Sequence, residues 1–182
     1  MLTPSSPRHP SLLLFAFVVW LGLTSEAVHA QVVVTIENTN PQISYFPSVC
    51  NVTGDQTRSA ACDGQWQILP LAGASSGSVT STYGPSPATD NIIPQLFLVL
   101  RGTSFVLRTS TSSNATVNVT LTANPSRLDI STIVDSSLGS VSAVDLPVNE
   151  DLTVALTYIP RPDGAVTRFD IDSITVTAAD SK

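Results

Sequence analysis

The chain has 182 residues, carries a formal net charge of −6, and contains only 12% charged residues. Its length allows one domain with a buried core of its own. The acidic balance and the scattered arginines argue against nucleic acid and anionic membrane surfaces as partners, because both are polyanions.

The first thirty residues have the pattern of a secretory signal peptide. Arg8 gives the start a weak positive charge, residues 11–23 form a continuous apolar run, and Ala30 is a small residue suited to cleavage. The run is short for a transmembrane helix, and an uncleaved signal anchor is the alternative. We expect cleavage after Ala30, secretion to the extracellular space and no membrane insertion afterwards. Residues 31–182 then form a single extracellular β-sandwich domain.

Alternating apolar and polar residues, rich in β-branched side chains, predict a series of short strands from residue 32 onward. Clusters of proline, glycine and asparagine separate them. The expected strands span residues 32–36, 43–46, 66–69, 79–83, 92–100, 103–109, 115–122, 128–134, 141–146, 152–158 and 169–176. Many short strands at regular spacing favour an all-β fold, an antiparallel β-sandwich of the jelly-roll type.

Cys50 and Cys62 are the only cysteines, and both follow the signal peptide. An even pair in a secreted chain indicates a disulfide, which would pin the loop before the strand at 66–69. A catalytic thiol is excluded because both histidines, His9 and His29, lie within the signal peptide. The same absence excludes a Ser-His-Asp triad.

The stretch 92–100 (IIPQLFLVL) is the densest apolar run after the signal peptide. Such a run predicts a strand that is buried on both faces at the centre of the sandwich. Arg101 and Gly102 follow as a turn, so we expect 92–100 and 103–109 to form a hairpin.

Three sequons predict N-glycosylation at Asn51, Asn114 and Asn118, each of which is followed by threonine two residues later. Asn118 lies within the strand at 115–122, where alternate valines and a leucine form the apolar face. Its own side chain falls on the polar face, where a sugar can be accommodated.

The last expected strand changes phase. Phe169 and Ile171 occupy odd positions, whereas Ile174 and Val176 occupy even positions. Because side chains alternate between the two faces of a strand, this phase change predicts a β-bulge or bend at Asp172–Ser173.

Three segments resemble a family of fungal, basidiomycete-type extracellular domains that are secreted or membrane-anchored. Residues 34–45 (VTIENTNPQISY) are similar to its VT-x-D-DTDPSI-x-Y signature, and residues 98–106 (LVLRGTSFV) to its F-x-F-x-GT-x-V step. Residues 146–176 are similar to its two closing strands. The resemblance implies a galactose-binding-like jelly roll, which is the fold of several carbohydrate-binding modules.

This sequence departs from the family pattern at several positions. Asn38 and Asn40 stand where the family favours aspartates, and Glu150 or Asp151 stands near a usual histidine. The fold expectation survives these changes, whereas a ligand does not carry over with a fold.

The resemblance also implies a possible structural calcium ion, which modules of this fold often hold between the first and last strands. Calcium takes several oxygen ligands, commonly carboxylates and backbone carbonyls. The carboxylates at the matching places are Glu37, with Asp170 or Asp172. The alternative is that these side chains simply face solvent.

Tyr83, Asp90 and Asn91 lie in a stretch rich in glycine, serine and proline, and such loops often carry ligand sites. The Tyr83 ring offers an apolar face for a sugar. Asp90, Asn91 and Arg101 are candidates for hydrogen bonds to sugar hydroxyls. Trp66, in contrast, is expected to pack in the core beside the disulfide.

Two functions follow from these features. The first is a secreted, non-catalytic domain that binds carbohydrate or cell-wall glycan. The second is an extracellular structural or protein-interaction domain without a sugar site. A glycosidase is the enzyme alternative, but it needs two paired carboxylates, and those of this chain are isolated in the sequence. We therefore expect no enzymatic activity.

Overall fold

The computed structural model describes residues 31–50 and 59–179. The expected signal peptide, the sequon at Asn51 and most of the loop between the two cysteines lie outside these residues. Within them, no helix has the length and apolar character needed to cross a membrane.

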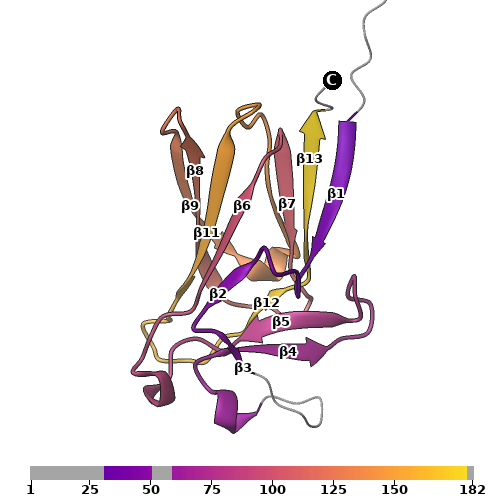
Figure 1. The fold of residues 1–182 in the computed structure, drawn as a ribbon. Helices are drawn as coiled ribbons and strands as arrows, with labels where there is room; N and C mark the ends of the chain where they lie inside the picture. The colour runs from indigo at the N-terminus through magenta and orange to yellow at the C-terminus, as the bar shows by residue number, and fades with distance from the viewer. Residues whose placement is uncertain (1–30, 51–58, 180–182) are drawn as a thin grey trace, which may run out of the picture.

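The strands assemble into three sheets (Figure 1). The terminal sheet has the order β1 (Gln31–Glu37), β13 (Ser173–Ala179), β7 (Ser104–Arg108), β10 (Ser140–Ala143). The five-stranded sheet has the order β2 (Ser44–Phe46), β6 (Gln95–Leu100), β11 (Asp151–Ile159), β8 (Thr116–Asn124), β9 (Asp129–Asp135). The basal sheet has the order β12 (Phe169–Ile171), β5 (Ser78–Thr82), β4 (Trp66–Pro70), β3 (Val49–Cys50). Short 3₁₀ turns lie in the connections: η1 (Ala60–Cys62), η2 (Pro87–Thr89), η3 (Ser136–Leu138).

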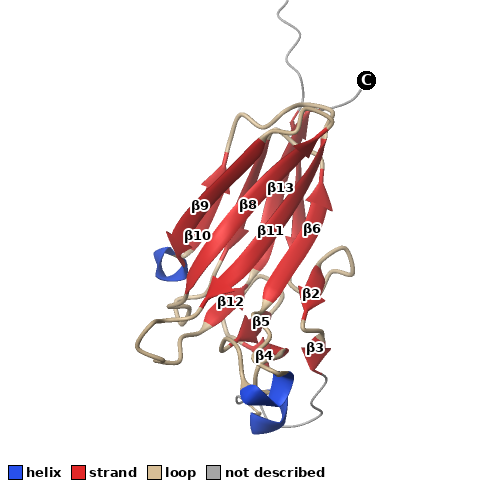
Figure 2. Cartoon of the chain, turned by 90° about the vertical axis from the view of Figure 1, so that its left-hand side faces the viewer, coloured by secondary structure: helices blue, strands red, loops and turns tan. Residues whose placement is uncertain are grey.

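The terminal and five-stranded sheets face each other and enclose the core (Figure 1, Figure 2). The alternation in the sequence decides which side chains point inward. In β8, Val117, Val119 and Leu121 are buried, whereas Asn118 is half-buried on the outer face. Each fully buried aliphatic side chain stabilises the fold by about 1.5–3 kcal/mol through removal from water. The predicted fold class, an all-β antiparallel sandwich of jelly-roll type, is confirmed.

The basal sheet lies across the lower end of the sandwich in Figure 1. Trp66 on β4 is completely buried, and its ring centroid lies 4.9 Å from that of Tyr45 and 5.9 Å from that of Phe169. Its Nε1 donates a hydrogen bond to the carbonyl oxygen of Phe46 at 3.3 Å. The expected core role of Trp66 is confirmed. The sheet itself was not predicted, because β12 and β5 are far apart in the sequence.

Two expectations for the stretch 92–100 are wrong. The strand β6 covers only its last six residues, and the outer face of β6 is open to solvent, with Phe97 37% and Val99 59% exposed. An apolar run alone does not show whether a second layer covers the sheet, and the outer side of the five-stranded sheet has no such layer among the described residues (Figure 2). β6 and β7 also do not pair, because they belong to different sheets.

Gly102 lies where the chain crosses from the five-stranded sheet to the terminal sheet. A Cβ atom at this position would lie 2.6 Å from Cγ1 of Val176 and 2.7 Å from the carbonyl oxygen of Thr177. The connection therefore passes so close to β13 that only glycine fits. The turn signal in the sequence was real, but it marks a crossing between sheets rather than a hairpin.

The phase change in the last strand is confirmed as a break at Asp172. β12 ends at Ile171 and pairs with β5, whereas β13 begins at Ser173 and pairs with β1 and β7. One residue thus moves the chain from the basal sheet to the terminal sheet. Since it lies between the two sheets, Asp172 is close to the loops that join them.

The predicted disulfide between Cys50 and Cys62 is present. The two Cα atoms lie 5.8 Å apart, and Cys62 is completely buried in η1. The bond ties the end of β3 to the turn that precedes β4. It therefore fixes the entry to the strand that carries Trp66.

Candidate functional site

A groove at the lower end of the molecule, which we call the base groove, lies between the loop after β5 and the loop that joins β11 to β12. Its volume is about 200 Å³. Two tyrosines, two prolines, an arginine and small or apolar residues line it: Tyr83, Pro85, Tyr158, Pro160, Arg161, Gly164, Ala165 and Val166. The groove therefore combines aromatic and polar chemistry at a loop surface, where ligand sites often lie.

The floor of the base groove is fixed by Tyr158, which is only 3% exposed. Its hydroxyl contacts the Thr167 hydroxyl and donates to the Thr167 carbonyl oxygen at 3.1 Å. Gly84 adopts a left-handed backbone with φ of +87°, and a Cβ atom there would lie 2.7 Å from a carbon of the Tyr158 ring. The loop that carries Tyr83 can therefore lie directly against this ring only because residue 84 lacks a side chain.

Tyr83 is held in place by a cation–π contact. The guanidinium carbon of Arg168 lies 5.9 Å from the centroid of the Tyr83 ring. Arg168 in turn donates through Nε to Asp170 at 2.7 Å and through Nη2 to the Ser81 hydroxyl at 3.2 Å. An arginine whose guanidinium is already held by hydrogen bonds loses little conformational freedom when an aromatic ring stacks on it, so it can orient that ring.

The carboxylate of Asp170 anchors this arrangement. Asp170 is completely buried, and it accepts hydrogen bonds from the hydroxyls of Ser81 and Ser110 in addition to that from Arg168. A buried charge is tolerated only when it is paired and hydrogen-bonded, which is the situation here. Asp170 therefore serves the interior of the domain rather than its surface.

The rim of the base groove carries an ion pair. Arg161 donates through Nε and Nη2 to both carboxylate oxygens of Asp163, at 3.1 and 2.7 Å. The hydrogen bond from Arg161 lowers the pKa of Asp163, so the carboxylate stays ionised. Val166 beside it is 61% exposed. A ligand in this groove meets an aromatic face, an apolar side chain and the guanidinium of Arg161, whose partner Asp163 is not among the lining residues.

The four ligand candidates from the sequence are not brought together. Tyr83 lines the base groove, but Asp90 and Asn91 do not belong to its lining. They form the turn after η2, with left-handed φ values of 52° and 56°. Arg101 lies at the crossing between β6 and β7 and pairs with Asp151 at the start of β11, an exposed pair. Arg101 and Tyr83 therefore lie at opposite ends of the sheets and do not form one site.

The groove residues that the sequence analysis missed lie in the loop from β11 to β12. Arg161 and Gly164, which line the groove, and Asp163, which pairs with Arg161, were visible in the sequence only as a strong turn signal, PRPDG. Nothing local in that signal says that the turn folds toward Tyr83. The contact depends on the basal sheet, which places β12 beside β5.

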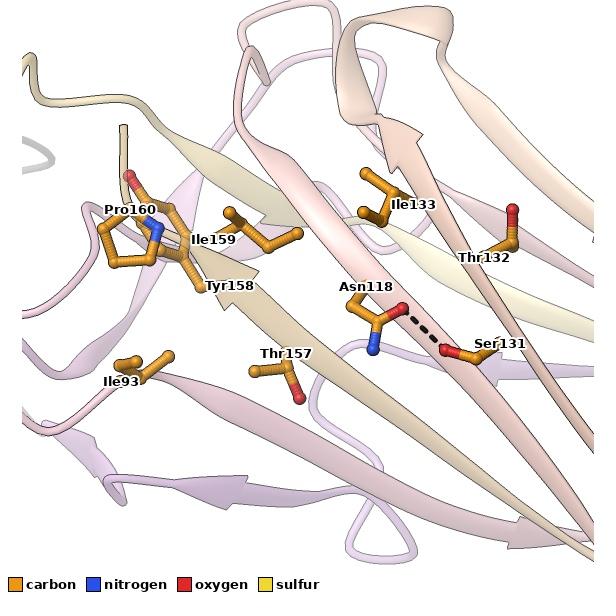
Figure 3. Close-up of a pocket in the computed structure, with 9 residues that line it drawn as sticks. All are labelled: Ile93, Asn118, Ser131, Thr132, Ile133, Thr157, Tyr158, Ile159 and Pro160. Atoms are coloured by element: carbon orange, nitrogen blue, oxygen red, sulfur yellow. Dashed lines mark hydrogen bonds between the residues drawn. The ribbon is translucent and has the colours of Figure 1, made fainter. Parts of the chain in front are cut away.

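A second, more open groove, which we call the face groove, lies on the outer face of the five-stranded sheet (Figure 3). Its volume is about 610 Å³. Isoleucines, hydroxyl side chains and one asparagine line most of it: Ile93, Asn118, Ser131, Thr132, Ile133, Thr157, Tyr158, Ile159 and Pro160. Tyr158 and Pro160 line both grooves, so the two are neighbours.

The predicted glycosylation sites differ in their surroundings. Asn114 is exposed, precedes β8, and accepts a hydrogen bond from the backbone nitrogen of Arg168 at 2.7 Å. Asn118 is half-buried within β8 and accepts one from the Ser131 hydroxyl at 2.9 Å. Asn51 lies outside the described residues.

The carboxylates considered for calcium are only partly brought together. Ser75 donates through its backbone nitrogen to Asp172 at 2.7 Å and through its hydroxyl to Glu37 Oε1 at 2.9 Å, so these two carboxylates converge on one residue. Glu37 Oε2 is buried without a hydrogen-bond partner. Asp170 has its own partners in the Arg168 network. Among the residues that the structure describes, no three histidine, cysteine, aspartate or glutamate side chains are placed to hold a metal ion.

The presence of asparagine at position 38, where the resembling family favours aspartate, has a physical explanation. Asn38 is completely buried, and its Nδ2 donates to the Thr80 hydroxyl at 3.2 Å while its Oδ1 accepts from the Ser76 hydroxyl at 3.0 Å. An aspartate could accept but not donate in this place. The side chain is thus adapted to join β1 with β5 and the loop before it.

No protein-family model matches the sequence, and no curated protein matches it. Among solved structures, the chain is similar to a family 35 carbohydrate-binding module from Clostridium thermocellum. The identity is 10% and the TM-score 0.49, and the match covers 81% of this chain and 99% of the module. It is also similar to a family two carbohydrate esterase from Cellvibrio japonicus, with 10% identity, a TM-score of 0.49 and coverage of 82% of this chain.

The chain spans 35% of the length of that esterase. An exo-β-1,3-galactanase from Phanerochaete chrysosporium is 16% identical with a TM-score of 0.43, over 79% of this chain and 29% of the galactanase. At these identities and TM-scores the likenesses assign no function to this chain. The resemblance to fungal extracellular domains likewise stays a prediction.

Proposed function

We propose that this chain is a secreted, non-catalytic domain that binds carbohydrate in the base groove. The observation that carries the proposal is the placement of Tyr83. Its ring is held against the Arg168 guanidinium at the edge of a groove whose rim carries the Arg161–Asp163 pair. Sugars present apolar C–H faces together with hydroxyls, so an aromatic ring beside charged hydrogen-bonding groups matches both parts of their surface.

The size of the base groove supports a small ligand unit. Its volume of about 200 Å³ is below the range of roughly 300–1,000 Å³ that is typical of pockets for drug-sized molecules. One sugar residue of a longer glycan fits this description better than a whole cofactor.

The residues of the groove favour binding without catalysis. Residues 31–182 contain no histidine, and Asp163, the carboxylate at the rim, is held by Arg161. Hydrolysis of a glycosidic bond commonly needs two carboxylates that flank the bond. Secretion is part of the proposal and is supported by the sequence pattern of residues 1–30, the disulfide and the sequons.

The test is a glycan array followed by calorimetry with residues 31–182, comparing Tyr83→Ala with Arg101→Ala. Arg101 is the matched control, because it was an equal candidate in the sequence and lies at the other end of the sheets. We expect Tyr83→Ala to weaken binding at least tenfold, which corresponds to about 1.4 kcal/mol, and Arg101→Ala to leave it unchanged. A folded domain that binds no glycan, or that loses binding equally with both variants, overturns the proposal.

A protein-interaction domain is the second candidate, and β1 favours it. Val32, Val33 and Val34 are 46, 63 and 49% exposed on a strand at the edge of the terminal sheet. An exposed apolar edge strand can pair with a strand from another chain. Co-purification separates the two candidates: a stoichiometric protein partner that survives deglycosylation and is lost with Val33→Lys supports this second function.

A further inference from the structure

The sequon at Asn118 lies at the centre of an outward-facing sheet surface. β8 is flanked by β11 on one side and β9 on the other, so Asn118 is opposite both Thr157 and Ile133. Its neighbours in sequence, Val117 and Val119, point into the core and are 0 and 3% exposed. The alternation of the strand therefore fixes Asn118 and Thr120 on the same outer face.

The orientation of the Asn118 amide leaves its nitrogen toward the face groove. Oδ1 accepts the hydrogen bond from the Ser131 hydroxyl at 2.9 Å, which holds the oxygen on the β9 side. Figure 3 shows Nδ2 pointing the other way, toward Thr157. The contact from Nδ2 to the Thr120 hydroxyl is long, at 3.5 Å. A group attached to Nδ2 would thus begin inside the groove.

The face groove is apolar where that group would lie. Ile133 on β9 lines one side and is 68% exposed, whereas Ile93, which is 41% exposed, lines the other side with Ile159 and Pro160. Contiguous exposed apolar side chains on a folded domain usually mark a covered surface. The occupant that the chain itself specifies is a sugar on Asn118, because sequon and groove coincide.

We propose that Asn118 carries an N-linked oligosaccharide whose first sugars lie in the face groove between Ile133 on one side and Ile159 and Pro160 on the other. In the modification, the Asn118 amide nitrogen bonds to the anomeric carbon of an activated oligosaccharide, a polyisoprenyl diphosphate sugar. The bond from that carbon to the diphosphate oxygen breaks, the diphosphate leaves with the electron pair, and the nitrogen gives up one proton. The transfer takes place before β8 pairs with its neighbours, since Asn118 lies on an interior strand.

The seated glycan gives the two grooves different roles. It covers the apolar wall of the five-stranded sheet, which has no second layer of protein among the described residues. It also ends beside the base groove, because Tyr158 and Pro160 line both. The inference rests on the secretion that the proposed function includes but not on the base groove, so a failure of glycan-array binding leaves it unaffected.

The chain offers a matched pair of sequon variants. Thr120→Val removes the Asn118 sequon, and Thr116→Val removes the Asn114 sequon. Both threonines are half-buried on β8, and both retain a β-branched side chain when changed to valine. Mass spectrometry of glycopeptides from the full chain, secreted by a eukaryotic host, should show loss of the Asn118 glycan only with Thr120→Val. An Asn118 that is unmodified in the secreted wild-type chain overturns the proposal.

The position of the glycan is tested by endoglycosidase cleavage between its first two sugars. We expect the Asn118 glycan of the native chain to be cleaved at least tenfold more slowly than that of the denatured chain. Ile133→Ser removes the largest exposed apolar contact from an edge strand and should restore fast cleavage in the native state. Fast native cleavage in the wild type, or slow cleavage that Ile133→Ser leaves unchanged, shows that the glycan is not seated in the groove.

Discussion

Replacing Asp170 by alanine tests whether the buried ion pair supports the lower end of the domain. The carboxylate is completely buried and accepts hydrogen bonds from Arg168, Ser81 and Ser110. Its removal leaves the two serine hydroxyls, which are 0 and 6% exposed, without that acceptor. Each buried polar group left unpaired costs about 1–3 kcal/mol.

The arginine adds less to the loss than its charge suggests. The side chain of Arg168 is 22% exposed, so it can regain water when its partner is removed. Breaking a buried pair by removing one partner typically costs about 3–5 kcal/mol. We therefore expect Asp170→Ala to lower the free energy of unfolding by about 3–5 kcal/mol, a large part of the roughly 5–15 kcal/mol typical of a domain.

The assay is urea unfolding followed by the fluorescence of Trp66, which is the only tryptophan after residue 30 and is completely buried. A lower midpoint at an unchanged slope reports lost stability rather than a changed native state. Asp151→Ala is the matched control, because it breaks the exposed pair with Arg101 and should give no resolvable change. If Asp170→Ala shifts the midpoint no further than Asp151→Ala, the role assigned to this network is incorrect.

Four more outcomes are expected. Cys62→Ser should destabilise the domain by about 2–5 kcal/mol, and alkylation of both thiols in the untreated secreted wild type would contradict the disulfide. Burial raises the pKa of Tyr45 above the ordinary value near 10. The buried neutral phenol therefore stabilises the fold fully below that pH, and this contribution is lost as the pH rises further. The melting temperature of Tyr45→Phe should fall less steeply with alkaline pH than that of the wild type. Gly84→Ala should lower the melting temperature more than Gly73→Ala, since both have φ of +87° but only the first meets neighbouring atoms; equal losses would show that no ring contact is involved. Because no three acidic side chains of the described residues are placed to hold a metal ion, calcium should leave the melting temperatures of the wild type and of Glu37→Gln unchanged; a rise in the wild type alone would show that Glu37 is a ligand.

The sequence by itself determined those features that depend on neighbouring residues. The alternation in β8 and β11 fixed which side chains enter the core, because successive side chains of a strand point to opposite faces. The phase change at Asp172 showed where the last strand must break. Cys50 and Cys62 had one possible pairing, so their bond needed no structural information.

Sheet membership was decided only by the tertiary structure. A turn at Gly102 reads the same whether the chain returns beside its own strand or crosses to the facing sheet. The close approach of β13 decides between them, and that strand comes some seventy residues later. The open outer face of β6 was invisible for the same reason, since an apolar run does not reveal whether another layer covers it.

The candidate site depended on the same long-range packing. Tyr83 was identified as a candidate because a loop exposes its ring, but its partners Arg161 and Arg168 lie about eighty residues further along the chain. The basal sheet joins these distant segments by pairing β12 with β5, whereas the crossing at Arg101 lies at the far end of the sandwich. Sequence periodicity is a local property of one strand. The end of a sheet at which a side chain finally lies is set by pairing between strands that are remote in the sequence, and only the folded chain contains that information.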